Sequence, residues 1–213
     1  MKKDIDLRGL LCPEPVLKTK KILDDQTVTS VEALVDSEVN IQNLARLARS
    51  QNFGFKSAAK GEHFVATISK EEVAPNTAPE PPAAAKQSKA KSGVVIFISK
   101  DRFGEPVAAP PGEEQEKNQA FSLNLLNVFL QTISQSGHDV QAVLLANSGV
   151  RLMDPESPCV KVLDELKEKG VEVLACGLCL DYYGLKEKVK TEQITNMYAI
   201  CEYLFAAEKV LSP

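Results

Sequence analysis

The sequence predicts an α/β protein with two domains, and three observations carry this prediction. Residues 71–92 are rich in Pro, Ala, Lys and Ser and offer almost no side chain that a core could bury, which is typical of a linker. Before this stretch, strand and helix patterns follow one another in the order βαβαββ; after it, long apolar runs alternate with helical patterns. We therefore expect an N-terminal domain at residues 1–70, a flexible linker at 71–92 and a C-terminal domain at 93–213.

The N-terminal domain is predicted as a two-layer sandwich, with two helices on a small mixed sheet. Alternating apolar residues, as at Val31, Ala33 and Val35, indicate strands, and apolar residues three and four apart indicate helices. Ser37 is suited to cap the second helix. The predicted strands are 5–8, 29–35, 53–59 and 63–70, and the predicted helices are 13–23 and the segment that follows Ser37.

The C-terminal domain is predicted as a doubly wound parallel sheet, in which ligands and chemistry gather at the carboxyl ends of the strands. The predicted strands are 93–99, 140–146, 171–175 and 209–211, and the predicted helices are 113–135, 156–169 and 195–207. Two apolar stripes predict that the first of these helices is well buried. In the last helix, the residues with core spacing are Met197, Tyr198, Cys201 and Leu204.

Composition excludes several classes of protein. The chain has 213 residues, of which 44% are hydrophobic, and a formal net charge of −4 with its Lys and Arg residues spread along it, so nucleic acid is not an expected partner. The chain starts with the charged segment MKKDIDLRGL and has no apolar run of about 18 residues. We therefore expect no signal peptide, no membrane span and a cytoplasmic location. Five cysteines, an odd number, do not resemble a disulfide framework, so reduced thiols are expected.

Cys12 lies directly before Pro13, with Pro15 two residues further on. Proline fixes φ near the helical value and lacks an N–H, so it is tolerated in the first turn of a helix. Cys12 is therefore predicted at or beside the N-cap, where the N–H groups of the first turn and the positive end of the helix dipole favour a thiolate. This position predicts a nucleophile; the alternative is a small buried hydrophobic residue next to prolines that only start the helix.

Three lysines follow Cys12 within about two helical turns, at Lys18, Lys20 and Lys21. Positive charge helps to hold a negative sulfur and attracts acidic partners. We expect Lys18 and Lys21 to take part in docking a partner protein.

A second pair of thiols, Cys176 and Cys179, begins where the predicted strand 171–175 ends. A zinc site needs about two more ligands, and the chain offers only His63 and His138 without a second close cysteine pair, so no metal is expected. Three interpretations stay open. The pair can be a redox dithiol, a persulfide-accepting nucleophile with a neighbouring or resolving thiol, or two small residues in a tight turn.

Two adjacent tyrosines, Tyr182 and Tyr183, follow this pair, and one of them is expected to face the site or a partner. Cys201 has core spacing. Cys159 follows Pro158 at a predicted helix start, where the dipole could activate it, but no second feature supports this, so a structural role is favoured.

These motifs resemble those of known families. The segment from Asp6 to Pro15, DLRGLLCPEP, resembles the Cys-Pro-x-Pro signature of the SirA/TusA family, whose fold has the same βαβαββ order. The C-terminal domain is similar to DsrE-like domains at residues 147–150 and 176–185. The tandem arrangement resembles YedF-type proteins, which are associated with selenium metabolism. The residues that support the two motifs are Asp6, Pro13, Pro15, Asp181 and Tyr182.

The resemblance implies a sulfurtransferase-like carrier that relays persulfide sulfur, or selenium, between proteins. Cys12 is then the carrier thiol, and Cys176 is the closest match to the acceptor position of DsrE-like domains. The implied partners are a cysteine desulfurase or another persulfide donor and a downstream acceptor protein, with homo-oligomers through the DsrE-like domain and no cofactor. The loop 102–112 departs from the shorter, Gly/Asp-rich loop that the resemblance predicts.

Two other functions stay open at this point. The first is a thiol–disulfide oxidoreductase that uses Cys176 and Cys179. The second is a non-catalytic adaptor, in which the basic face of the first helix docks a partner and the cysteines are incidental.

Overall fold

The computed structural model describes residues 1–70, 93–105 and 110–213. The chain forms two compact units, and each is described by itself. The predicted linker at 71–92 lies outside the described residues, as does the 106–109 part of the loop 102–112.

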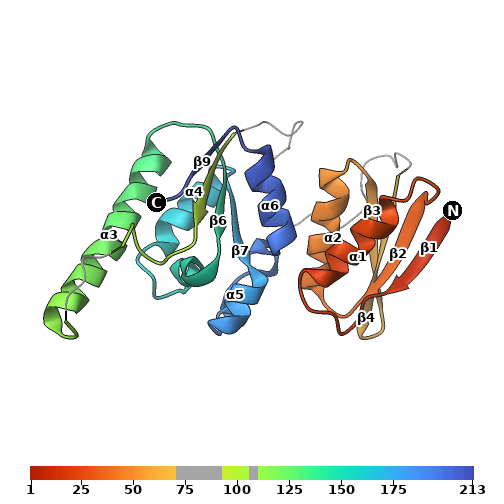
Figure 1. Ribbon diagram of the computed structural model, residues 1–213, viewed down its shortest axis with the longest axis horizontal. Coiled ribbons are helices and arrows are strands. Elements are labelled where there is room, and N and C mark those ends of the chain that lie inside the picture. The colour runs from red at the N-terminus through yellow and green to blue at the C-terminus, as the bar shows by residue number, and fades with distance from the viewer. Residues whose placement is uncertain (71–92, 106–109) are drawn as a thin grey trace. The chain divides into compact units, whose positions relative to one another are not determined.

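The first unit has the predicted βαβαββ order (Figure 1). Its elements are β1 (Lys2–Asp6), α1 (Glu14–Leu23), β2 (Ser30–Val35), α2 (Glu38–Ser50), β3 (Gly54–Lys60) and β4 (His63–Ser69). The strand order is β1-β2-β4-β3, with β1 parallel to β2 and β4 antiparallel to both of its neighbours. The sheet is therefore mixed, as the sequence predicts.

The core of this unit lies between the sheet and its two helices. Every second residue of β2 is buried, namely Val31, Ala33 and Val35. Helix α2 begins as predicted, because the Ser37 side chain accepts a hydrogen bond from the N–H of Asn40 at 3.3 Å. The apolar side chains that complete this core include Leu7, Val16, Leu23, Leu44, Leu47, Phe55 and Ile68.

Strand β1 differs from the predicted strand at residues 5–8. It runs from Lys2 to Asp6, and its pairing with β2 ends at Asp6. The first residues of β1 are polar, so the apolar pattern does not mark them as part of a strand. They can be polar because β1 is an edge strand, in which Lys2 pairs with Glu32 on β2 at 2.6 Å instead of burying an apolar side chain.

The second unit contains a parallel sheet with the strand order β8-β7-β6-β5-β9. Its elements are β5 (Val94–Ile98), α3 (Glu113–Gln135), β6 (Val140–Leu145), η1 (Asn147–Met153), α4 (Val160–Glu168), β7 (Glu172–Cys176), α5 (Gly177–Tyr182), η2 (Lys186–Lys188), η3 (Thr191–Gln193), β8 (Ile194–Thr195), α6 (Met197–Ala206) and β9 (Lys209–Leu211).

The connections place the ends of three strands side by side. The chain steps from β5 to β6 to β7 in one direction, through α3 and then α4, and later returns to β9 at the far edge. Because crossovers between parallel strands are right-handed, steps in opposite directions put their helices on opposite faces, which gives a doubly wound sheet. The carboxyl ends of β5, β6 and β7, at Ile98, Leu145 and Cys176, therefore meet at one edge.

Three details of this unit differ from the prediction. Helix α4 begins at Val160 and not at 156, because Pro158 and the turn before it delay the first helical hydrogen bond. The short elements η1, α5 and β8 have no counterpart in the prediction. In α6 the buried residues are Ala199 and Ile200, whereas Met197, from the predicted stripe, is 42% exposed.

The prediction that α3 is well buried is wrong. Only Ser122, Leu126 and Leu130 of α3 are buried, and Phe121 is 67% exposed. Leu125 and Val128 are exposed on the same side of the helix as Phe121, at the spacing of one helical face. Part of the apolar surface of α3 therefore faces solvent instead of the core.

Among the described residues, no helix combines the length and the apolar character that crossing a membrane requires.

Gly149 of η1 lies against the end of β5, so its replacement by alanine is expected to destabilise the second unit. A Cβ at this position would lie 2.3 Å from the Ile98 carbonyl oxygen. Because the neighbour is backbone, the unit can relieve the clash only by moving a strand or the η1 turn, and Gly149→Ala is expected to lower the free energy of unfolding by about 3 kcal/mol.

The matched control is Gly137→Ala, where φ is +72° and no atom lies within 4 Å of the added Cβ. This variant costs only the left-handed backbone conformation, about 1 kcal/mol. Denaturant unfolding of the two variants measures the difference, and equal losses would contradict the close packing of η1 on β5.

Candidate thiol sites

Cys12 lies immediately before the start of α1. Pro13 is the N-cap residue, the helix begins at Glu14, and Pro15 lies within its first turn. The Cys12–Pro13 peptide bond is cis, and the Cys12 side chain is half-buried. The thiol is thus beside the N-cap.

The first turn of α1 offers less to a thiolate than the sequence suggests. The Glu14 N–H donates to the Leu11 carbonyl oxygen at 2.9 Å, and the Val16 and Leu17 N–H groups both donate to the Pro13 carbonyl oxygen at 3.1 Å. Pro13 and Pro15 have no N–H to donate. The positive end of the helix dipole is the contribution of α1 that favours a thiolate at Cys12.

Two carboxylates hold the loop that carries Cys12. The Asp6 carboxylate accepts two-pronged hydrogen bonds from the Arg8 guanidinium, at 2.6 Å from Nη2 and 2.9 Å from Nε, and one from the Arg8 backbone N–H. These bonds to Arg8 lower the pKa of Asp6 to about 2. The second carboxylate, Asp36, accepts the Gly9 N–H at 2.8 Å.

Gly9 has a φ of +70°, which glycine adopts without strain. Asp36 also accepts a hydrogen bond from the Asn40 side chain at 2.9 Å. Asp36 was not predicted as a residue that holds the Cys12 loop. The signal in the sequence was its position as a carboxylate between the end of the predicted strand 29–35 and the cap residue Ser37.

The lysines near Cys12 are partly neutralised. Lys18 pairs with Glu14 at 3.3 Å and Lys20 pairs with Asp24 at 2.8 Å, both one helical turn apart. Lys21 is exposed and makes no ion pair with the part of the chain that the structure describes. Of the lysines in α1, Lys21 is therefore the one whose charge is most available to a partner.

Exposed apolar side chains flank the thiol of Cys12. Leu11 is 77% exposed and Leu17, one turn into α1, is 45% exposed. Large apolar side chains that stay in solvent beside a reactive group are typical of a surface that a partner covers.

The C-terminal thiols, Cys176 and Cys179, lie at the carboxyl edge of the second sheet. Cys176 ends β7 and is the N-cap residue of α5, with an exposed fraction of only 1%. Burial raises the pKa of its thiol to about 11, and the N–H groups of Cys179 and Leu178 act in the opposite direction. At neutral pH Cys176 is therefore a thiol rather than a thiolate.

Cys179 differs from Cys176 in exposure and in partners. It is half-buried, and its sulfur accepts a hydrogen bond from the Asn147 N–H at 3.1 Å. The neighbouring Cys179 side chain also raises the pKa of the Cys176 thiol. The structure thus brings the two thiols together, with Cys179 as the more accessible one.

Of the two tyrosines, Tyr183 is the one that faces the site. Its hydroxyl reaches the Asn147 side-chain oxygen at 3.4 Å, whereas Tyr182 is 83% exposed and stacks edge-on against Tyr183. Asp181 is exposed and pairs with Lys186 at 3.7 Å. Asn147 was not predicted as a site residue. Its backbone is left-handed, with a φ of +46°.

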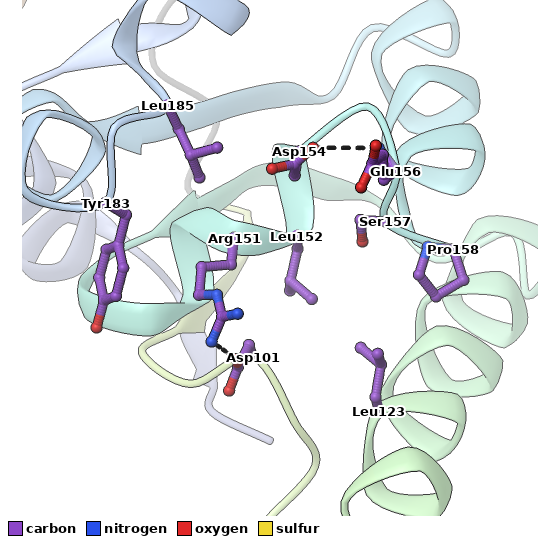
Figure 2. Close-up of a pocket in the computed structure, with 10 residues that line it drawn as sticks. All are labelled: Asp101, Leu123, Arg151, Leu152, Asp154, Glu156, Ser157, Pro158, Tyr183 and Leu185. Carbon is purple, nitrogen blue, oxygen red and sulfur yellow. Dashed lines mark hydrogen bonds and ion pairs between the residues drawn. The ribbon is translucent and has the colours of Figure 1, made fainter.

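A pocket of about 510 Å³ lies next to Tyr183 (Figure 2). It is lined by Asp101, Leu123, Arg151, Leu152, Asp154, Glu156, Ser157, Pro158, Tyr183 and Leu185. The Asp101 carboxylate, 14% exposed, holds Arg151 at 3.1 Å and also Arg102 at 2.9 Å. Asp101 follows β5, so the pocket shares the carboxyl edge of the sheet with the thiols. Neither cysteine lines it.

The other two cysteines have no role at these sites. Cys159 is fully buried, and burial raises the pKa of its thiol to about 11. Cys201 lies within α6 and is half-buried. None of the five cysteines, all of which the structure describes, takes part in a disulfide bond. Within residues 1–70, 93–105 and 110–213, no three His, Cys, Asp or Glu side chains come close enough together to hold a metal ion.

The clamp between Asp6 and Arg8 predicts a titration. Because the pKa of Asp6 is about 2 in the folded chain, below its ordinary value, the carboxylate contributes stability that is complete above about pH 4 and is lost as the pH falls through about 2. The side-chain carboxyl carbon of Asp6, followed by NMR, is expected to show this low midpoint. In Arg8→Gln the midpoint is expected to rise toward the ordinary value, whereas Lys2→Gln leaves it unchanged.

The two C-terminal thiols are expected to differ in alkylation. With its pKa at about 11, Cys176 has on the order of a hundredfold less thiolate at pH 8 than an ordinary thiol, and it is buried as well. Iodoacetamide, followed by peptide mass mapping, is therefore expected to modify Cys179 well before Cys176. The denatured chain is the control, and similar rates in the folded chain would contradict this arrangement.

Solved structures with similarity to the chain cover one unit each. The SirA-like protein from Desulfitobacterium hafniense is 30% identical over 33% of this chain and 99% of its own, with a TM-score of 0.31. The ychN protein from E. coli is 19% identical over 57% of this chain and 99% of its own, with a TM-score of 0.36. A conserved protein of unknown function from Bacteroides thetaiotaomicron is 18% identical over 59% of this chain and 100% of its own, with a TM-score of 0.39. No curated protein matches the chain.

Two protein families match the sequence directly. Residues 3–70 match the family described as Sulfurtransferase TusA, and residues 104–213, just over half of the chain, match the DsrE/DsrF-like family. Both families are related to sulfur relay and work with protein partners, so the chain has a general role in carrying sulfur. It belongs to the DsrE/DsrF-like family and carries a TusA domain before the DsrE-like one.

Proposed function

We propose that the protein accepts sulfur as a persulfide on Cys12 and passes it to another protein. The observation that carries this proposal is the position of the Cys12 thiol, beside the N-cap of α1 and on a loop that Asp6 and Asp36 hold from two sides. A fixed thiol at the positive end of a helix dipole is suited to attack an outer sulfur.

The reaction is a sulfur transfer between thiols. The Cys12 thiolate attacks the terminal sulfur of a donor persulfide, the bond between the two donor sulfurs breaks, and the donor leaves as a thiolate. A second attack, by an acceptor thiolate on the terminal sulfur at Cys12, reverses the roles. The sulfur needs no cofactor for either step, because each step exchanges one S–S bond for another.

The proposed donor is a cysteine desulfurase or another protein persulfide, and the proposed acceptor is a downstream protein. The exposed Leu11 and Leu17 offer such a partner an apolar contact beside the thiol. Lys18 and Lys21 add positive charge on the same helix, with Lys21 outside any ion pair among the described residues.

We propose that Cys179 is the second sulfur-accepting thiol and that Cys176 is not. The resemblance to DsrE-like domains points to Cys176, but this residue is 1% exposed and burial raises the pKa of its thiol to about 11. Cys179 is half-buried, and the Asn147 N–H donates a hydrogen bond to its sulfur and orients it. A donor protein can reach Cys179 more easily.

The proposal extends to selenium, location and assembly. Selenium in place of the terminal sulfur follows the same exchange chemistry, so the same thiolate serves both elements. A cytoplasmic location is proposed because the odd number of cysteines does not resemble a disulfide framework. The exposed Phe121, Leu125 and Val128 of α3 support self-association of the DsrE-like domain with a second copy of this chain, which light scattering measures.

The carrier proposal is tested by loading the reduced full chain with a cysteine desulfurase and cysteine and measuring the intact mass. Because Cys179 is also proposed to accept sulfur, peptide mapping identifies which residue is loaded. We expect an added sulfur atom on the Cys12 peptide that is absent from Cys12→Ser and kept in Cys201→Ser, because Cys201 belongs to neither site. No added sulfur on the Cys12 peptide of the parent would contradict the role of Cys12, and no adduct on any cysteine would contradict the carrier function.

A thiol–disulfide oxidoreductase is the second candidate, and the closeness of Cys176 and Cys179 at the start of α5 favours it. In that case mild oxidation removes two hydrogens from the mass of the unloaded chain, and Cys179→Ser abolishes the loss. An adaptor is distinguished by partner binding that Lys18→Glu and Lys21→Glu weaken while Cys12→Ser has no effect.

A further inference from the structure

The two C-terminal thiols, Cys176 and Cys179, lie close together in the sequence and in the structure. Cys176 and Cys179 are three residues apart across the start of α5, and the Cys179 side chain is close enough to raise the pKa of the Cys176 thiol. Residues three apart on a helix face the same side, within the range that a disulfide can span. Cys12, in contrast, is the single cysteine of residues 1–70.

The two thiols also differ in exposure, and this difference determines which of them meets a sulfur donor first. Cys179 is half-buried and its sulfur is oriented by the Asn147 N–H at 3.1 Å, whereas Cys176 is 1% exposed. An incoming donor therefore meets Cys179 first. Once Cys179 carries an added sulfur, its inner sulfur still lies beside Cys176, and its outer sulfur is the atom next to solvent.

We propose that Cys176 resolves a persulfide formed on Cys179, so that the DsrE-like domain releases the transferred sulfur as hydrosulfide. This inference rests on the proposal that Cys179 accepts sulfur. It gives the two domains different chemistry: a persulfide on Cys12 has no neighbouring cysteine in residues 1–70 and is handed on, while a persulfide on Cys179 is discharged on the spot.

The step balances within the pair. The Cys176 sulfur, after losing its proton, attacks the inner sulfur of Cys179–S–SH and forms the Cys176–Cys179 disulfide. The bond between the inner and outer sulfurs breaks, and the outer sulfur leaves with the electron pair as hydrosulfide. The Cys176 sulfur is oxidised from the thiol to the disulfide level, the departing sulfur is reduced from the persulfide to the sulfide level, and the Cys179 sulfur keeps its oxidation level. A dithiol reductant then returns the disulfide to two thiols and completes a turnover.

The same chemistry explains why a buried, poorly ionised thiol is useful here. An exposed thiolate at this position would compete with Cys179 for the incoming donor, and it would exchange with other disulfides. Cys176 reacts instead only with a partner that is already next to it, where proximity compensates for the low thiolate fraction. The raised pKa of Cys176 further predicts that hydrosulfide release becomes faster as the pH rises from 7 to 9, since the thiolate fraction of Cys176 grows throughout that range.

The test uses the reduced full chain carrying Cys12→Ser, so that the outcome does not depend on the carrier thiol. Inorganic tetrasulfide loads the chain directly, without a desulfurase, and excess reagent is removed by gel filtration. Released hydrosulfide is then measured with time, and peptide mass mapping reports the state of Cys176 and Cys179. Cys159→Ser in the same background is the matched control, because Cys159 is as buried as Cys176 but does not belong to the pair of Cys176 and Cys179.

We expect hydrosulfide release together with a Cys176–Cys179 disulfide in the parent and in the Cys159→Ser control. In Cys176→Ser the added sulfur is expected to persist on Cys179, and release is expected to slow by at least about tenfold. Release at the parental rate in Cys176→Ser, or a lasting persulfide on Cys179 beside a reduced Cys176, would overturn the inference. If Cys179 never takes up sulfur from tetrasulfide, the inference fails as well, and desulfurase loading of Cys12 separately decides the carrier proposal.

Circular dichroism and a denaturant melt establish that Cys176→Ser folds. If it does not, Cys176→Ala takes its place, since alanine fills the buried site without a polar group.

Discussion

The hydrogen bond from the Ala146 N–H to the Ile98 carbonyl oxygen, 3.0 Å long, joins the ends of two neighbouring strands, and the C-terminal site depends on it. It fixes where β6 gives way to η1, and Gly149 lets that turn approach Ile98 without a side chain in between. From this anchored turn the Asn147 N–H reaches Cys179, and Arg151 reaches Asp101. The pocket, the ion pair of Arg151 with Asp101 and the Cys179 sulfur are thus positioned by one backbone junction.

The N-terminal site follows the same principle with different groups. There the loop after β1 is held by side chains, with Asp6 binding Arg8 and Asp36 binding the Gly9 N–H. In both sites a candidate thiol lies close to the start of a helix that follows a strand, Cys12 just before α1 and Cys179 within the first turn of α5, and a group from elsewhere in the chain holds that region. Reactivity requires an exposed thiol, and the fixing group limits the freedom that exposure would otherwise allow.

The sequence predicts the parts of this structure that local patterns determine. The Ser37 cap, the βαβαββ order and the parallel strands all follow from spacing and burial along a short window. Asn147 and Asp36 escape such reasoning because each acts on a residue about thirty positions away, and the local sequence does not show which residue that is. The exposure of Phe121 was predicted wrongly because periodicity defines an apolar face of a helix but not what covers it.

The two prolines at the start of α1 have a consequence for competing ligands. Helix N-termini commonly bind phosphate or sulfate through N–H groups that have no other partner. In α1, Pro13 and Pro15 lack the group, and the N–H groups of Glu14, Val16 and Leu17 are already bonded to backbone carbonyl oxygens. Inorganic anions such as phosphate therefore gain little by binding there, and they would compete only weakly with the persulfide donor that we propose for Cys12.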